Sequence, residues 1–246
     1  MKAVILAAGR GSRLAPYSEI LPKPLMPVTV DGTGAFVPII DLLIAQISRA
    51  GVDGIVVAVN YLAEMIVRHL GDGSRYGLPI SYVYQEQLDG NAGAFYRAQS
   101  LVRGQDVIVT DSDNYLDDAE VFTAMAERHR SSGAACTVAV SRVENIRKFA
   151  IIKTGARGEA VDIFEKPEDR GVWGNLAKSG MMILSAELAS EDKSIALTPQ
   201  GEYTTTAIIK HCLATGKPVE LFELSGGFND IGTWPEYLSV LKRTIV

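Results

Sequence analysis

The sequence predicts an α/β fold with a doubly wound, mainly parallel sheet and a smaller antiparallel lobe. In about the first 142 residues, apolar runs of strand length alternate with longer segments of helical period, as in a parallel sheet covered by helices. After Arg142, strand-like runs follow one another with little helix between them, which predicts antiparallel pairing. The chain has 246 residues, of which 47% are hydrophobic and 22% charged, so one domain with a sizeable core is expected.

The alternating part begins with a buried strand at residues 2–8, which are nearly all apolar and stop at Gly9. A helix is expected at residues 38–50, because Pro38 suits the first turn, Gly51 suits the stop, and aliphatic side chains recur on one face. Further strands are expected at residues 54–59, 80–84, 106–110 and 136–141, and further helices at 63–70, 92–101 and 118–130. Ligands of such sheets bind beyond the carboxyl ends of the strands.

The second part is expected to hold strands at residues 150–153, 161–166 and 179–184, forming an antiparallel insert or lobe on one side of the cleft. A helix at 203–215, a strand at 219–223 and a helix at 235–242 complete the prediction. The sequence contains no internal repeat, low-complexity tract or obvious interdomain linker. Residues 1–246 are therefore interpreted as a single domain whose halves meet near residue 142.

Charge and composition exclude several classes of protein. The net charge of −5, from 24 basic and 29 acidic residues, argues against binding to nucleic acid, which needs a basic surface. The two cysteines and three histidines are scattered, so they predict neither a disulfide framework nor a cysteine- or histidine-based metal site. The apolar run at residues 1–8 is too short for a signal peptide or a membrane span, so a cytoplasmic protein without a membrane partner is expected.

The connection after the first strand, residues 6–28, combines the features of a phosphate site. Gly9 and Gly11 allow the backbone to turn its N–H groups toward an anion. Arg13 and Lys23 lie in the same loop and can neutralise phosphates. A connection of this length without structure of its own is usually functional.

Two other glycine-rich motifs and a purely structural turn are the alternatives for this loop. A redox dinucleotide fingerprint, G-x-G-x-x-G, would need glycine where Leu14 stands and a helix where Pro16 intervenes. The P-loop pattern is absent. A structural turn is disfavoured, because it does not account for Gly9, Gly11, Arg13 and a Lys-Pro pair in one loop.

Polar and acidic residues follow other predicted strands at the same edge of the sheet. Gln85 ends the third strand, and its amide can both donate to and accept from a base edge. Gly90 opens the next helix, whose N-terminus can receive a nucleoside. Asp111 and Asp113 follow the fourth strand, where a carboxylate in a phosphate-binding cleft is a natural Mg²⁺ ligand.

Together these motifs resemble the signature of the sugar-1-phosphate nucleotidylyltransferase family, over nearly the whole chain. Residues 6–16 match the family pattern L-A-x-G-x-G-[ST]-R-L-x-P, and residues 22–28 match P-K-[PA]-[LM]-x-P-[VI]. The chain is similar to glucose-1-phosphate thymidylyltransferases and mannose-1-phosphate guanylyltransferases. The resemblance implies a Rossmann-like fold of the nucleotide-diphospho-sugar transferase type, in its short form with a single catalytic domain. It also implies a nucleotide-binding first half and a sugar-binding second half.

The resemblance assigns roles to the residues of the nucleotide half. Gly9 and Gly11 are expected to cradle the triphosphate, Arg13 to contact its β- and γ-phosphates, and Lys23 to contact its α-phosphate. Arg13 and Lys23 are thus the expected catalytic pair. The expected nucleotide-binding residues are Leu6, Ala8, Gly9, Gly11, Gln85, Gly90 and Asp111.

The same resemblance implies that Mg²⁺ is the cofactor. Asp113 aligns with one metal carboxylate of the family, although Ser112 replaces the usual glycine before it. Asp230, in an intact Asp-Ile-Gly-Thr motif, aligns with the other. Asp230 could instead cap the last helix, but Thr233 is better placed for capping. Asp111 either shares the metal or serves as a turn acid, and the sequence leaves both open.

On the sugar side, the resemblance rests on an E-K-P motif at residues 165–167. It implies that Glu165 holds sugar hydroxyls and that Lys166 holds the sugar phosphate. Asn175 and Gly180 follow at a spacing that resembles the sugar-facing strand. Ala207 departs from the family pattern, because an aspartate is usual there, and the identity of the sugar stays open.

The implied reaction transfers a nucleotidyl group from a nucleoside triphosphate to a sugar 1-phosphate and releases pyrophosphate. The attacking phosphate is an anion at about pH 7, so the reaction does not need a Ser-His-Asp or Cys-His arrangement. UTP or dTTP is favoured over GTP or CTP, because Gln85 suits uracil or thymine. The alternatives are a non-sugar acceptor, such as phosphocholine or a cyclitol phosphate, and a paralogue that binds nucleotide sugars without turnover. Homo-oligomers are common in the family.

Overall fold

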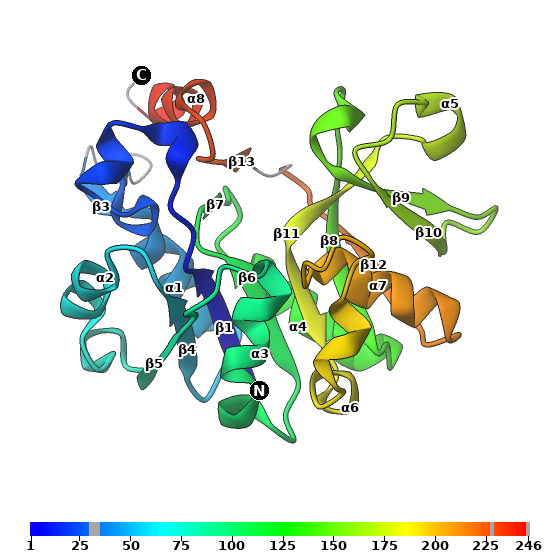
Figure 1. The fold of residues 1–246 in the computed structure, drawn as a ribbon, viewed down its shortest axis with the longest axis horizontal. Coiled ribbons are helices and arrows are strands. Elements are labelled where there is room, and N and C mark those ends of the chain that lie inside the picture. Colours follow the sequence, from blue (N-terminus) through cyan, green and yellow to red (C-terminus); the bar gives the residue numbers. More distant parts are fainter. Residues whose placement is uncertain (30–34, 227–228, 245–246) are drawn as a thin grey trace.

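The computed structural model describes residues 1–29, 35–226 and 229–244. Over these residues, a nine-stranded mixed sheet forms the centre of the molecule (Figure 1). The path of strands is β10-β9-β11-β6-β1-β4-β5, with β8 paired to β11 and β12 paired to β8. The strands span β1 (Lys2–Ala7), β4 (Ile55–Val59), β5 (Ile80–Tyr84), β6 (Val107–Asp111), β8 (Cys136–Arg142), β9 (Ala150–Thr154), β10 (Ala160–Glu165), β11 (Leu176–Leu184) and β12 (Val219–Glu223).

Parallel pairing is confirmed in the first part of the chain, since β6, β1, β4 and β5 pair in parallel in that order. The long strand β11 runs antiparallel to both β6 and β8. Its first half also pairs with β9, through Ala177 opposite Ile151. The predicted antiparallel lobe is therefore a continuation of the central sheet, and β11 is the strand that the two parts share.

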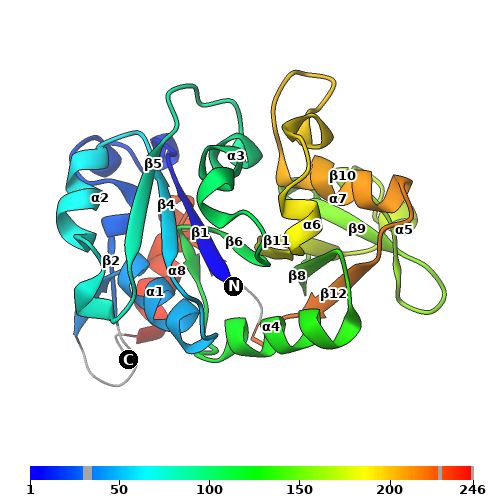
Figure 2. The same cartoon turned by 90° about the horizontal axis from the view of Figure 1, so that it is seen from below.

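Helices cover both faces of the sheet, as the sequence predicts (Figure 2). One face packs against α1, α2 and α4 through side chains such as Ile44, Ile66 and Phe122. The other packs against α3, α6 and α7 through Phe95 and Ile208, among others. The helices span α1 (Ile39–Arg49), α2 (Ala63–Leu70), α3 (Asn91–Val102), α4 (Val121–Ser132), α5 (Arg170–Trp173), α6 (Ala186–Ala189), α7 (Thr205–Ala214) and α8 (Trp234–Thr244). No helix in the described ranges is long and apolar enough to cross a membrane.

Two short ribbons lie outside the main sheet. β2 (Pro27–Thr29) pairs with β3 (Phe36–Pro38), and β7 (Asn114–Tyr115) pairs with β13 (Asn229–Asp230). The chain then returns to its own N-terminal loop, because α8 packs against that loop in a separate apolar cluster that includes Leu14, Met26 and Tyr237. The second half of the sequence therefore contributes to both sides of the molecule.

Candidate active site

A cleft of about 640 Å³ opens at the carboxyl ends of the parallel strands. This volume suits a small-molecule site, for which roughly 300–1,000 Å³ is typical. Most of the residues predicted from the sequence line it: Leu6, Ala8, Gly9, Gly11, Arg13, Lys23, Gln85, Gly90, Asp111, Asp113, Glu165, Gly180 and Asp230. Lys166 and Asn175 are not among the lining residues. The structure thus brings together residues from both halves of the sequence at one edge of the sheet.

The loop after β1 is more ordered than the sequence suggests. It contains three 3₁₀ turns, at Ser12–Leu14, Tyr17–Glu19 and Lys23–Leu25. Leu14 is fully buried and anchors the loop against α8. Gly11 has φ 63°, and a Cβ atom there would lie 3.3 Å from the Cβ atom of Lys23. Glycine at this position therefore allows both the left-handed turn and the close approach of the lysine.

The two predicted metal carboxylates lie side by side. In the β7–β13 ribbon, Asp230 is paired with Asn114, the residue after Asp113. The backbone N–H of Ile231 donates to the carbonyl oxygen of Asp113 at 3.2 Å. The ammonium group of Lys23 contacts the carboxylate of Asp113. A long-range strand pairing thus brings the two acids together with one of the loop cations.

Asp111 ends β6 and is a partly buried carboxylate of the cleft. Burial and the neighbouring Asp113 carboxylate raise the pKa of Asp111 to about 6, although Lys178 and Lys23 act in the opposite direction. The space for its side chain depends on Gly180 of β11, where a Cβ atom would lie 2.3 Å from Asp111 Oδ2. Asn114 Nδ2 supports this corner by donating to Thr110 Oγ1 at 3.1 Å and to the Asp111 carbonyl at 3.2 Å.

Asp230 experiences the same crowding of negative charge. Burial raises its pKa first, and the carboxylates of Asp113 and Glu236 raise it further, while Lys23 and Arg13 lower it. Such carboxylates gain from a cation placed between them. A metal ion bound here would therefore favour the ionised form of this cluster.

The charges around the cleft also suit a divalent cation. Its lining includes four cations and five carboxylates: Arg13, Lys23, Lys148, Lys178, Asp111, Asp113, Glu165, Glu202 and Asp230. A polyphosphate would meet an excess of negative charge unless a cation were added. Within the ranges that the structure describes, no group of three acidic, histidine or cysteine side chains could hold a metal alone. Mg²⁺ takes one or two carboxylates and completes its shell with phosphate oxygens and water, so the adjacent Asp113 and Asp230 are a sufficient pair for it.

Gln85 lies just after β5, at the other end of the row of parallel strands from Asp111. It is 2% exposed, and its amide Nε2 donates to Asp89 Oδ1 at 2.8 Å and to the Gly90 carbonyl oxygen at 3.0 Å. Gly90 has φ 109°, and a Cβ atom there would lie 2.1 Å from the carbonyl oxygen of Tyr203. The predicted base-reading residues therefore belong to one rigid corner of the cleft.

The residues predicted to bind the sugar lie only partly in the cleft. Glu165 lines it and accepts a hydrogen bond from Thr206 Oγ1 at 2.6 Å. Lys166 directly follows β10 in a left-handed backbone conformation, with φ 50°, and is exposed. Asn175 is outside the lining, and its carbonyl oxygen accepts from the N–H of Val143 at 3.0 Å. The roles assigned to Lys166 and Asn175 stay predictions that this geometry does not support.

Two lysines that the sequence analysis did not select line the cleft instead. Lys178 lies two residues before Gly180 on β11, so the two share a face of the strand. That alternation was the available signal for Lys178. Lys148 lies in a 3₁₀ turn before β9, and its ammonium nitrogen is 3.6 Å from Glu236 Oε1 on α8. Nothing in the local sequence around Lys148 indicates this long-range position.

The comparison with protein families agrees with this geometry. The family model described as nucleotidyl transferase matches residues 2–245, almost the entire chain. The chain belongs to the nucleotidyl transferase family. Its glycine loop, paired aspartates and strand-end glutamine line one cleft.

Several named relatives are similar over most of this nucleotidyl transferase chain. It is 30% identical over 233 residues to the low-salt glycan biosynthesis nucleotidyltransferase Agl11 of Haloferax volcanii, covering 94% of this chain and 62% of that protein. It is 28% identical over 236 residues to the UTP–glucose-1-phosphate uridylyltransferase AglF of the same organism, covering 96% and 93%. It spans only 51% of the bifunctional protein GlmU of Methanococcus maripaludis, at 30% identity over 94% of this chain.

Solved structures show the same nucleotidyl transferase fold. A UDP-glucose pyrophosphorylase in complex with UDP-glucose has a TM-score of 0.82 at 21% identity, covering 98% of this chain and 97% of the other. A Bacillus anthracis structure, assigned as a glucose-1-phosphate thymidylyltransferase and solved with sucrose, has a TM-score of 0.87 at 24% identity, covering 99% and 95%. At these identities the likeness establishes the fold.

Proposed function

We propose that the chain catalyses the Mg²⁺-dependent transfer of a nucleotidyl group from a nucleoside triphosphate to a sugar 1-phosphate. One observation carries the proposal: Asp113 and Asp230 lie next to each other beside Lys23, in the cleft that Arg13 also lines. The names of relatives in the family, which include uridylyl-, thymidylyl- and guanylyltransferases of hexose 1-phosphates, support the acceptor class.

In this reaction, an oxygen of the acceptor phosphate forms a bond to the α-phosphorus, and the bond from the α-phosphorus to the β-phosphate oxygen breaks. The pyrophosphate carries the electron pair away. The attacking oxygen is already an anion, so positioning and charge stabilisation provide most of the catalysis. No proton needs to be removed by a side chain before attack.

The loop after β1 provides the groups that hold the triphosphate. Gly9 and Gly11 leave room for phosphate oxygens against the backbone. Arg13 would bind the departing pyrophosphate, and Lys23, next to Asp113, would bind the α-phosphate.

Asp113 and Asp230 would hold the metal, with Asp111 beside them as a third acidic group. A bound Mg²⁺ neutralises phosphate charge and favours in-line displacement. The packing of Gly180 against Asp111 and the β7–β13 pairing would keep these carboxylates in place.

For the acceptor, the cleft favours Lys178 over Lys166 as the residue that binds the sugar phosphate. Lys178 faces the cleft near Asp111, and its ammonium group donates only to the carbonyl oxygen of Ser179, at 3.1 Å, among its contacts with the described chain. It has no carboxylate partner within the described ranges. Lys148 is a second cation on the same side. Glu165, held by Thr206, is available to sugar hydroxyls.

A pyrophosphate-release assay of the purified chain tests the proposal, with nucleoside triphosphates crossed against a panel of hexose 1-phosphates, phosphocholine and a cyclitol phosphate. We expect Mg²⁺-dependent release of pyrophosphate with at least one hexose 1-phosphate. Release only with phosphocholine or the cyclitol phosphate would show that the acceptor is not a hexose 1-phosphate. Absence of release with every combination would refute nucleotidyl transfer.

A further inference from the structure

We propose that Asp89 is a positioning residue that fixes the amide of Gln85 so that the cleft selects nucleobases with an imide N–H. Uracil, thymine and guanine have such a group, whereas cytosine and adenine do not. The inference rests on the proposed function, because it concerns the nucleotide end of the same cleft. It defines the class of base that the site accepts and names the residue responsible.

The orientation of the Gln85 amide follows from its two partners. Nε2 lies 2.8 Å from Asp89 Oδ1 and 3.0 Å from the carbonyl oxygen of Gly90. A carboxylate and a carbonyl can only accept hydrogen bonds, so the amide must face them with its NH₂ group. The reversed amide would place its oxygen against two acceptors at a residue that is 2% exposed, where water cannot compensate.

Asp89 is itself held in place from several sides. A Cβ atom on Gly93 would lie 2.0 Å from Asp89 Oδ1, so the carboxylate occupies the space that this glycine leaves free. The second carboxylate oxygen faces Arg97, whose Nη2 lies 3.8 Å away. The Asp89 carbonyl oxygen accepts from the N–H of Tyr203 at 2.7 Å, which joins this corner to the segment before α7. The protein's own residues therefore hold Asp89 in place, and Asp89 in turn holds the Gln85 amide.

These two hydrogen bonds leave the amide oxygen Oε1 of Gln85 available to a ligand. Both N–H groups of the amide are engaged, and no donor among the described residues contacts Oε1. Gln85 lines the cleft, so a ligand meets an acceptor there. A side chain that normally both donates and accepts is reduced to an acceptor by its surroundings.

Nucleobases differ at the position that such an acceptor reads. Uracil and thymine present N3–H, and guanine presents N1–H, at the centre of the Watson–Crick edge. Cytosine and adenine present an acceptor nitrogen at that place, and they must shift along the edge to bring an amino group to Oε1. Two facing acceptors are unfavourable in a buried site, and a site built to hydrogen-bond one group discriminates strongly against a ligand that lacks it.

The test compares kcat/KM for UTP, dTTP, GTP, CTP and ATP with the best sugar 1-phosphate, in the wild-type chain and in variants. We expect the wild type to favour its best imide base over CTP and ATP by about a hundredfold or more. Asp89→Asn lets its own amide donate to Gln85, so the Gln85 amide can turn, and we expect the preference to fall about tenfold. Gly93→Ala displaces the Asp89 carboxylate without touching Gln85 and is expected to lower the preference likewise.

Glu86→Gln is the matched control, because Glu86 is an exposed acid next to Gln85 that does not hold the amide. It removes the same charge and should leave the preference among bases unchanged. A wild type that prefers CTP or ATP would overturn the inference while leaving nucleotidyl transfer intact. So would an Asp89→Asn variant that loses activity equally with all five nucleotides, since a purely structural role predicts that result. Absence of turnover with every nucleotide would instead contradict the proposed function.

Discussion

Gly180 packs against the Asp111 side chain, beside the predicted metal carboxylates, and leaves no room for a side chain of its own. The family resemblance assigns Gly180 to the sugar side, and the structure adds a reason for glycine, because a Cβ atom would lie 2.3 Å from Asp111 Oδ2. The Asp111 side chain is partly buried, which limits how far its carboxylate can move. The glycine is therefore required by the neighbouring acid as well as by any ligand.

Gly180→Ala is expected to lower kcat by about a hundredfold, because the displaced Asp111 would disturb the adjacent carboxylates. Steady-state pyrophosphate release measures the loss, and thermal unfolding checks that the variant is folded. The control is Gly171→Ala, whose Cβ atom would come no nearer than 3.1 Å to a neighbouring side chain. Equal activity of both variants would contradict the proposed crowding.

Lys178 and Lys166 provide a second test at the scale of single residues. The motif pattern selects Lys166, whereas the cleft presents Lys178 near Asp111. Lys178→Met is expected to lower kcat/KM for the sugar 1-phosphate by about tenfold to a hundredfold, with the KM for the nucleotide nearly unchanged. Lys166→Met serves as the matched variant and is expected to have a much smaller effect. A larger loss of kcat/KM in Lys166→Met than in Lys178→Met would instead support Lys166 as the residue that holds the sugar phosphate, as the E-K-P motif implies.

At the scale of elements, the periodic segments could be predicted from the sequence. The bounds of α2 and β5 agree with the prediction, since helical or strand periodicity coincides there with clear stop signals. Helix α4 begins at Val121, later than predicted, because residues 118–120 form a turn in which Asp118 Oδ1 accepts from the Glu120 N–H at 2.8 Å.

The β7–β13 ribbon could not be predicted, because two-residue strands carry no periodic signal. Its pairing is a long-range contact, so the proximity of Asp113 and Asp230 depended on the family resemblance until the structure placed them together. The hydrogen bond between Gln85 and Asp89 spans only four residues, but it lies in a segment between β5 and α3 that has no periodic pattern, so the sequence analysis did not select Asp89.

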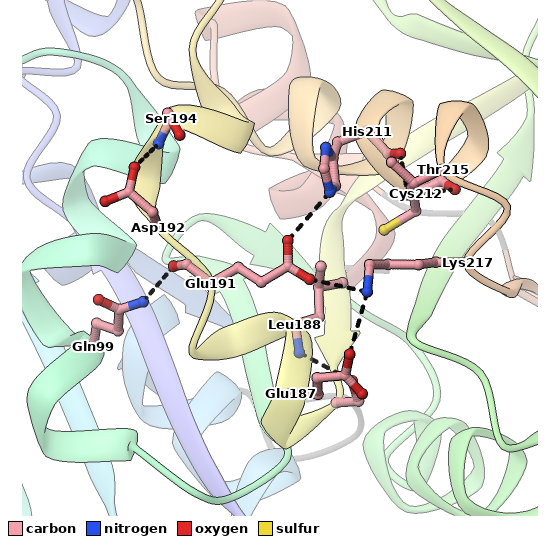
Figure 3. Close-up of polar contacts among 11 residues, drawn as sticks. Gln99, Glu187, Leu188, Glu191, Asp192, Ser194, His211, Cys212, Thr215 and Lys217 are labelled. Carbon is pink, nitrogen blue, oxygen red and sulfur yellow. Dashed lines mark hydrogen bonds and ion pairs between the residues drawn. The ribbon is translucent and has the colours of Figure 1, made fainter.

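A polar network connects α3, α6 and α7 on the side of the sheet opposite α1 and α4 (Figure 3). The Glu191 carboxylate lies 3.2 Å from His211 Nε2 and 3.0 Å from Lys217 Nζ. The Glu191 carbonyl oxygen accepts from Gln99 Nε2 at 2.7 Å. Because α7 also carries Thr206, which holds Glu165 at the cleft, this network supports the helix from its other end.

Glu191→Gln should therefore lower the free energy of unfolding by on the order of 1 kcal/mol, because it weakens two contacts of a largely buried carboxylate. Urea denaturation measures the change. Glu187→Gln is the control, because the Glu187 carboxylate contacts Lys217 and is 83% exposed, and it should cost less than about 0.5 kcal/mol. Equal losses in the two variants would mean that the network does not support α7.

At the scale of the whole molecule, the two halves of the sequence are interleaved. Helix α8 packs on the loop after β1, where Tyr237 donates from its hydroxyl to the Pro27 carbonyl oxygen at 2.6 Å. On the other side of the cleft, Asn91 of α3 and Thr205 of α7 exchange hydrogen bonds of 3.1 and 3.0 Å. The residues proposed to hold phosphates, metal and sugar are thus supported by contacts that cross from one half to the other.

The central claim is that Asp113 and Asp230 hold one metal ion for nucleotidyl transfer, beside the glycine loop. Pyrophosphate release against Mg²⁺ concentration, measured for the wild type, Asp113→Asn, Asp230→Asn and the double variant, tests it most directly. We predict that each single variant loses activity by about a hundredfold or more. The double variant should be only slightly less active than the less active single variant, because both residues serve the same ion. Wild-type turnover with unchanged Mg²⁺ dependence in both folded single variants would contradict the claim.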